Sequence, residues 1–140
     1  MSKVAVVYWS GTGNTKMMAD AVEEGAKSAG AEVTVFEAAD FSDSDVNGFD
    51  GIAFGCPAMG AEVLEETEFD PMFTSVEGAL AGKKIALFGS YGWGDGQWMR
   101  DWEERCEGTG ASLVTESVMA NNEPGADELS ACSALGAALA

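Results

Sequence analysis

The segment YWSGTGNTK at residues 8–16 changes abruptly from bulky aromatic residues to small hydroxyl, amide and glycine residues. Its loop, Ser10-Gly11-Thr12-Gly13-Asn14-Thr15, precedes a helical pattern, so its backbone N–H groups would point out from the start of a helix. Such amides and the helix dipole favour an anion, and the hydroxyl and Asn14 side chains add uncharged donors. The loop therefore predicts a phosphate site; a plain helix cap with a tight turn is the alternative.

Two nucleotide-binding motifs fail to match this loop. A Walker A loop needs a lysine followed by Ser or Thr, but Lys16 is followed by Met17. A dinucleotide-binding GxGxxG loop would need its third glycine at the position of Lys16. The sequence therefore disfavours NTP hydrolysis and NAD binding through these motifs.

A second glycine-containing loop is CPAMGAE at residues 56–62. Met59 offers a polarizable face, and Gly60 has a backbone free to reverse its peptide. Glu62 could accept a hydrogen bond from the imide N–H of a ring. The alternative is a hydrophobic residue before an ordinary turn.

A third loop, GSYGWGDG at residues 89–96, places Trp93 between glycines that give the indole no local packing partner. A planar ligand stacked on Trp93 would contribute roughly 0.5–1.5 kcal/mol beyond area burial, and the amides of Gly92 and Gly94 could donate to ring carbonyls. A protein-contact hot spot is the alternative. Together the three loops predict a ligand with a phosphate, a chain and a flat hydrogen-bonding ring, and FMN fits that description.

The surrounding sequence alternates strand and helix patterns. Strands are expected at residues 3–9, 31–38, 51–58, 83–90 and 111–120, and helices at 14–29, 64–76, 96–107 and from about 123 to 140, with a short acidic helix or loop at 41–50. This repeat predicts one α/β domain over residues 1–140, with a parallel sheet and helices on both faces. The three glycine loops would then meet at the carboxyl edge of the strands, where such sheets bind ligands.

Composition excludes several functions. The net charge of −17 disfavours nucleic acid and anionic membrane surfaces and favours a basic protein partner, although acidity also keeps a small protein soluble. The chain has no histidine, which excludes imidazole catalysis and histidine-ligated metal sites, and no metal site is expected. Three cysteines with no CxxC pair and no signal peptide predict free thiols in the cytoplasm, and Cys56 is interpreted as a structural thiol.

The helix expected at 96–107 carries two predictions about packing. Trp98 and Trp102 are four residues apart and are expected to pack in the core. Arg100–Glu104 and Asp101–Arg105 have the same spacing and are expected to form pairs on the helix surface.

The segments VVYWSGTGNT, FGCPAMGAEVLEE, FGSYGWGDGQWMRDWEER and NNEP make the sequence resemble the short-chain, clostridial type of flavodoxin. The resemblance implies a three-layer α/β/α sandwich with a five-stranded parallel sheet of order 2-1-3-4-5. It also implies non-covalently bound FMN held by residues of all three loops. These are Ser10, Gly11, Thr12, Gly13, Asn14 and Thr15; Pro57, Ala58, Met59, Gly60, Ala61 and Glu62; and Ser90, Tyr91, Gly92, Trp93, Gly94 and Asp95.

In this resemblance the first loop holds the phosphate, and Met59 and Trp93 cover the two faces of the flavin. The peptide after Met59 reverses on one-electron reduction, which Gly60 permits because a Cβ would penalise the reversed backbone. Many relatives carry Asp where this chain has Ala61, so the charge beside flavin N5 differs here.

The function that the resemblance implies is that of a low-potential one-electron carrier, not an enzyme, that shuttles between the semiquinone and hydroquinone of FMN. Its partners would be redox proteins with basic docking surfaces, and the carrier would be a cytoplasmic monomer. The segment at residues 61–70 places acids beside the second loop, namely Glu62, Glu65, Glu66, Glu68 and Asp70. We interpret them as a docking rim for such partners; a solvated helix face is the alternative. The alternative is an FMN-dependent NAD(P)H or quinone oxidoreductase on the same fold. A phosphoryl-accepting receiver domain is disfavoured, because the third strand ends in Cys56-Pro57 rather than Asp.

Overall fold

The computed structural model describes residues 2–59, 63–92 and 94–140, and near-continuous apolar runs form the central strands of its parallel sheet. The strands are β1 (Lys3–Tyr8), β2 (Glu32–Glu37), β3 (Gly51–Gly55), β4 (Lys84–Tyr91), β5 (Ser112–Leu113) and β6 (Val118–Asn121). All pair in parallel in the order β2-β1-β3-β4-β5, and β6 also pairs with β4. This confirms the predicted sheet and its order, with a sixth strand added.

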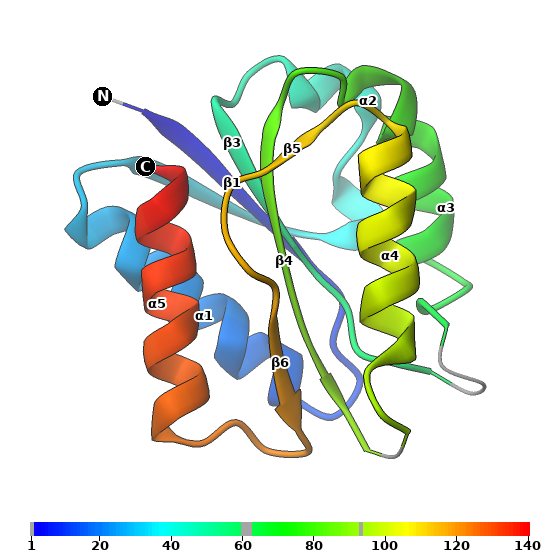
Figure 1. The fold of residues 1–140 in the computed structure, drawn as a ribbon. Helices are drawn as coiled ribbons and strands as arrows, with labels where there is room; N and C mark the ends of the chain where they lie inside the picture. The colour runs from blue at the N-terminus through cyan, green and yellow to red at the C-terminus, as the bar shows by residue number, and fades with distance from the viewer. Residues whose placement is uncertain (1, 60–62, 93) are drawn as a thin grey trace.

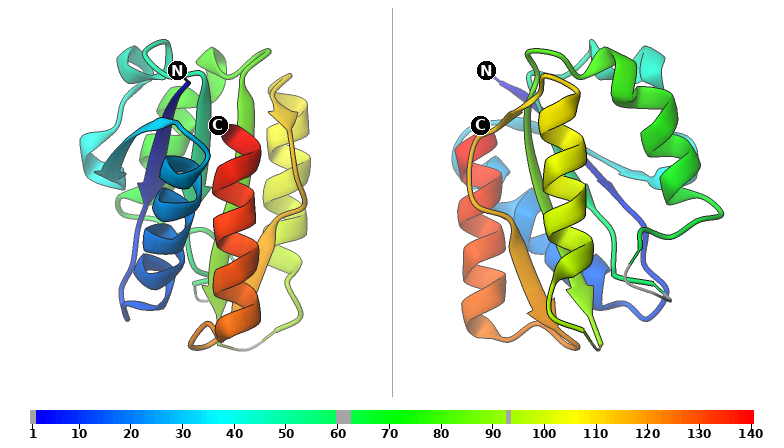
Figure 2. Two further views of the ribbon diagram at one scale, coloured as in Figure 1. Left: turned by 90° about the vertical axis from the view of Figure 1, so that its left-hand side faces the viewer. Right: turned by 45° about the vertical axis from the view of Figure 1, so that its right-hand side comes forward.

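Helices cover both faces of the sheet (Figure 1). They are α1 (Asn14–Ser28), α2 (Asp43–Val46), α3 (Phe69–Val76), α4 (Gln97–Gly108) and α5 (Ala126–Leu139), with short 3₁₀ turns at Ala38–Asp40 and Glu77–Ala79. Both views of Figure 2 show α1 and α5 side by side on one face, with α3 and α4 on the other. In the described part of the chain, no helix is long and apolar enough to cross a bilayer.

Alternate residues of each buried strand feed two separate cores, as expected for strands that are covered on both faces. Val4, Val6 and Ala53 pack with α1 and α5, whereas Ile52 and Phe54 pack with α3 and α4. The second core contains Trp98 and Trp102, each 1% exposed, so the prediction that both tryptophans are core residues is confirmed.

The fifth predicted strand, at residues 111–120, is divided into β5 and β6. Leu113 pairs with Ile85 and Val118 pairs with Phe88. Between these two pairs the edge strand advances by five residues, whereas β4 advances by three. An edge strand accommodates such extra residues because nothing pairs with its far side. The division leaves β6 beside the carboxyl half of β4, where the predicted site lies.

The helix predicted at 64–76 begins later, at Phe69. The preceding residues form a turn in which the Glu65 side chain accepts hydrogen bonds from the backbone N–H groups of Thr67, Glu68 and Phe69. Of these three donors only the Phe69 N–H belongs to the helix, whose N-cap is Glu68, so the Glu65 carboxylate caps the helix start from the preceding turn. This hydrogen-bonded turn takes the place of the first helical turn expected here.

Candidate functional site

The loop between β1 and α1 presents free backbone donors at the start of a helix. Ser10 Oγ accepts from the N–H groups of Gly13, at 3.1 Å, and Lys16, at 3.3 Å, and Gly13 has a φ of +96° that closes the turn. The N–H groups of Gly11, Thr12 and Thr15 have no acceptor among residues 2–59, 63–92 and 94–140. The loop therefore offers an anion the donors that a helix start leaves unpaired.

The ammonium group of Lys16, which directly follows this loop, is paired with a carboxylate on α1. The Lys16 ammonium lies 3.3 Å from the Asp20 carboxylate one turn along α1, and this hydrogen bond raises the pKa of Lys16. Both side chains are largely exposed. An anion in the loop would thus be held by neutral groups.

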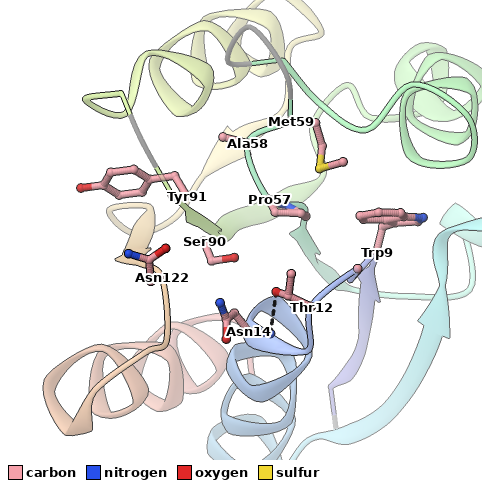
Figure 3. A pocket seen from close by; sticks show the side chains of 11 residues that line it. Trp9, Thr12, Asn14, Pro57, Ala58, Met59, Ser90, Tyr91 and Asn122 are labelled. Atoms are coloured by element: carbon pink, nitrogen blue, oxygen red, sulfur yellow. Dashed lines mark hydrogen bonds between the residues drawn. The ribbon is translucent and has the colours of Figure 1, made fainter.

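A pocket opens beside this loop at the carboxyl ends of β1, β3 and β4 (Figure 3). Among the described residues, none that lines it is charged. They are Trp9, Gly11, Thr12, Asn14, Pro57, Ala58, Met59, Ser90, Tyr91, Gly92 and Asn122. Figure 3 shows Tyr91 and Trp9 on opposite sides, with Ser90, Asn14 and Thr12 between them. Nine of the predicted site residues therefore line one pocket.

Thr15 and Ser90 connect two of the loops beneath the pocket. Their hydroxyl oxygens lie 3.0 Å apart, and Thr15 is 1% and Ser90 4% exposed. Ser90 lines the pocket, whereas the Thr15 hydroxyl is engaged in this interior contact. The phosphate-binding role expected for Thr15 stays a prediction.

The loop after β3 is attached to β4 and closed by a short antiparallel bridge. Ala58 N–H donates to Ser90 O at 2.9 Å, and Met59 and Val63 exchange backbone hydrogen bonds of 2.8 and 3.0 Å. Met59 is 37% exposed and lines the pocket. The predictions for Gly60, Ala61 and Glu62 lie outside the described residues.

The loop after β4 turns through two glycines in the left-handed region, Gly94 and Gly96, each with a φ of +91°. The carboxylate and carbonyl of Asp95 both accept from Arg100, each at 3.1 Å. This contact takes Arg100 away from its expected partner Glu104. Gly94 and Asp95 are not among the residues that line the pocket, and Trp93 lies outside the described residues.

Sequence reasoning missed two pocket residues, Trp9 and Asn122. The Trp9 ring lies against Gly11, where an added Cβ would be 3.0 Å from it, and its indole N–H donates to Glu68 at 2.9 Å. Asn122 has a φ of +61° and donates its N–H to Tyr91 O at 2.7 Å. Each directly follows a strand at the ligand-binding edge, which was the available signal for both.

The acidic segment at residues 61–70 is less uniform than expected. Glu66 is exposed, but Glu65 is 4% exposed and acts as the cap of α3, so the expectation of a solvent-facing carboxylate there is wrong. Asp70 accepts from Arg105, which also reaches Glu77 and therefore joins α4 to α3 instead of pairing with Asp101.

The three cysteines are free and buried. Burial raises the pKa of the Cys106 and Cys132 thiols to about 12 and raises that of Cys56 further. All three are therefore neutral at physiological pH, which supports the structural interpretation of Cys56.

Comparison with known proteins identifies the family. A sequence model of the family described as Flavodoxin matches residues 6–136. The chain belongs to the flavodoxin family. It is 47% identical over 119 residues to a flavodoxin of Clostridium beijerinckii (85% of this chain, 86% of the relative), and 47% identical over 129 residues to that of Megasphaera elsdenii (90% and 94%).

Solved flavodoxins have the same fold. The solution structure of two-electron reduced Megasphaera elsdenii flavodoxin superposes with a TM-score of 0.89, at 47% identity, and covers 97% of each chain. Oxidised flavodoxin 1 of Bacillus cereus superposes with a TM-score of 0.86, at 25% identity, and covers 99% of this chain and 97% of its own. The chain is thus an FMN-binding electron carrier that exchanges electrons with redox partners, and the enzyme alternative is not favoured.

Proposed function

We propose that the pocket at the ends of β1, β3 and β4 holds FMN non-covalently, with the phosphate on the Ser10–Thr15 loop and the ring between the loops that follow β3 and β4. The observation that carries this proposal is the set of amides at Gly11, Thr12 and Thr15 that have no acceptor among the described residues, beside a pocket whose described lining carries no charge. These donors suit a phosphate, and the mostly apolar slot next to them suits a flat ring.

The same geometry supports a low potential. When bound, FMN supplies the ability to take up one electron at a time, and the protein sets the free energy of each step through nearby charges and hydrogen bonds. Neutral phosphate donors and a net charge of −17 leave added negative charge poorly compensated. The carrier therefore cycles between its one-electron-reduced and fully reduced states as a strong reductant.

The residues outside the described ranges keep their expected roles within this proposal. Gly60 lets the peptide after Met59 reverse, Glu62 accepts from the ring imide, and Trp93 stacks on the flavin. The two hydrogen bonds between Met59 and Val63 support this assignment, because they hold the ends of the segment beside the pocket.

Phosphate recognition is tested by comparing FMN with riboflavin, which lacks the phosphate. Quenching of flavin fluorescence gives both dissociation constants. Several hydrogen bonds to a charged group, at roughly 1.5–3 kcal/mol each, should make riboflavin bind at least about 100-fold more weakly. Equal affinities would refute the phosphate assignment.

The carrier role is tested by anaerobic stepwise reduction of the FMN-loaded chain, followed by visible absorbance. A blue one-electron-reduced form should accumulate before the flavin bleaches. Direct passage from yellow to colourless would indicate two-electron chemistry instead.

The partners we propose are redox proteins with basic docking surfaces. We further propose that the carrier is a monomer and works in the cytoplasm. The net charge of −17 and the exposed Glu66 beside the flavin loop support the docking, and the three free cysteines support a reducing compartment. Electron-transfer rates with a partner reductase should fall steeply with ionic strength. Flat salt dependence would reject this docking mode, and gel filtration tests the monomer.

A further inference from the structure

The chain before residues 60–62 is fixed to the core through Cys56 and Ala58. Cys56 N–H donates to Phe88 O at 3.1 Å and Ala58 N–H to Ser90 O at 2.9 Å, which continues the pairing of β3 with β4 beyond the strand. The indole N–H of Trp98 donates to Cys56 O at 3.2 Å from the core side. The first end of the flavin loop is therefore held by buried groups.

The chain after residues 60–62 returns to the same cysteine. Glu65 N–H donates to Cys56 Sγ at 3.4 Å, and the thiol in turn donates to Pro57 O at 3.5 Å. Cys56 is fully buried, and burial raises its pKa, so the sulfur keeps the proton that it donates. One thiol thus connects the two sides of the loop.

The Glu65 carboxylate continues this connection into α3. One oxygen accepts from the N–H groups of Glu68, at 2.8 Å, and Phe69, at 2.9 Å; the other accepts from the Thr67 N–H, at 2.8 Å, and from the Thr67 hydroxyl. Burial alone would raise the pKa of Glu65, but these four hydrogen bonds outweigh it and lower the pKa. A buried carboxylate with both oxygens engaged fixes the backbone that leads out of the loop.

We propose that Glu65, acting through Cys56 and the start of α3, is a positioning residue that holds Met59 and Val63 in their paired arrangement beside the flavin site. Among the described residues, the hydrogen bonds of its carboxylate come from Thr67, Glu68 and Phe69, none of which lines the pocket. Glu65 fixes where Val63 returns to pair with Met59. This inference rests on the proposed function, because it assumes FMN in the pocket.

Glu65→Gln tests the proposal with an almost isosteric change. The amide keeps one acceptor oxygen and turns its NH₂ group toward the other two partners. At least one backbone N–H therefore loses its acceptor whichever way the amide points: either those of Glu68 and Phe69, or that of Thr67, whose hydroxyl can instead accept from the NH₂. Glu66→Gln is the matched control, since it removes the same charge from the adjacent exposed residue. Any purely electrostatic effect on flavin reduction should appear in both variants.

Two measurements on the FMN-loaded full chain decide the question. In Glu65→Gln, the formation constant of the one-electron-reduced flavin should fall about tenfold, and the exchange of the Met59 and Val63 amide protons should quicken about tenfold. In Glu66→Gln both should change less than about twofold. A lower melting temperature with both quantities unchanged would show a merely structural cap and overturn the proposal, as would equal effects in the two variants.

Cys56→Ala keeps the test decisive if Glu65→Gln fails to fold, because it removes only the thiol that joins the two sides of the loop. Cys132→Ala is its control, a fully buried thiol on α5 across the sheet. The first variant should lower the formation constant and quicken exchange, and the second should not. If the wild-type chain itself binds no FMN, the proposed function fails and the positioning role fails with it. If the wild type behaves as expected but Cys56→Ala changes neither the formation constant nor the exchange rates, only the positioning role is overturned.

Discussion

Gly89→Ala should damage the site from within the sheet. An added Cβ at Gly89 would lie 2.2 Å from Cys56 O and 3.2 Å from the Trp98 ring, whereas ordinary contact begins at 3.4 Å. The Cys56 carbonyl must therefore move by about 1 Å, and it is backbone that cannot rotate away as a side chain tip can. The hydrogen bond from the Trp98 indole to that carbonyl would break.

The magnitude follows from these two effects. Overpacking costs about 1–3 kcal/mol, and a buried indole N–H left without an acceptor costs about 1–3 kcal/mol. A total loss of about 3 kcal/mol in the free energy of unfolding should lower the melting temperature by about 10 °C in a chain of this size. FMN affinity should also fall, by about tenfold, because Pro57 and Ala58 line the pocket immediately after Cys56.

Thermal unfolding followed by circular dichroism gives the first quantity, and flavin fluorescence titration gives the second. Gly78→Ala is the matched control, since it makes the same chemical change at an exposed glycine with no atom within 4 Å of the new Cβ. A Gly89→Ala chain that melts within about 2 °C of the Gly78→Ala chain and binds FMN equally well would refute this reasoning.

Four further outcomes are expected. Gly136→Ala places a Cβ 2.1 Å from a backbone oxygen of α1, so it should destabilise by about 3 kcal/mol in denaturant titration yet spare FMN affinity in the folded fraction. Gly60→Ala should lower the maximal one-electron-reduced fraction in redox titration; an unchanged maximum would contradict the peptide reversal. Cys106 and Cys132 should react with a thiol reagent at pH 8 only after unfolding, because burial raises the pKa of each to about 12. The pKa of Glu65 in the folded state lies below its ordinary 4.5, so the ionised carboxylate contributes to stability above that pH and the contribution is lost on acidification. The difference in the free energy of unfolding between wild type and Glu65→Gln should therefore persist at pH 7 and shrink as the pH falls below 4.5.

The sequence was sufficient to predict the sheet and the edge at which ligands bind. Strands β1, β3 and β4 are covered on both faces, so their residues are apolar almost without interruption. Such runs can be recognised in the sequence without knowledge of the tertiary structure. Glycine loops then mark the ends of those runs. Local composition therefore predicted the strands and the glycine loops, whereas the resemblance supplied the strand order and the set of site residues, nine of which line the pocket.

The errors arose where side-chain spacing along a predicted helix indicated the wrong environment or the wrong partner. The pattern around Glu65 is that of a solvated acidic helix, but the hydrogen bonds that bury this carboxylate depend on where Phe69 starts the helix. Arg105 has a suitable partner four residues away, yet it bonds to Asp70 and Glu77 on the neighbouring helix. Spacing along one element cannot rank a local partner against one brought near by the fold.

The last two residues of β4 are the common attachment of all the loops around the pocket. The Ser90 hydroxyl meets Thr15 from the first loop, its carbonyl accepts from Ala58 in the second, and the Tyr91 carbonyl accepts from Asn122 after β6. Loops held in this way lose little further freedom when a ligand enters, so less binding energy is spent on ordering them. The affinity for FMN should therefore depend on the end of β4 as well as on the residues that touch the cofactor.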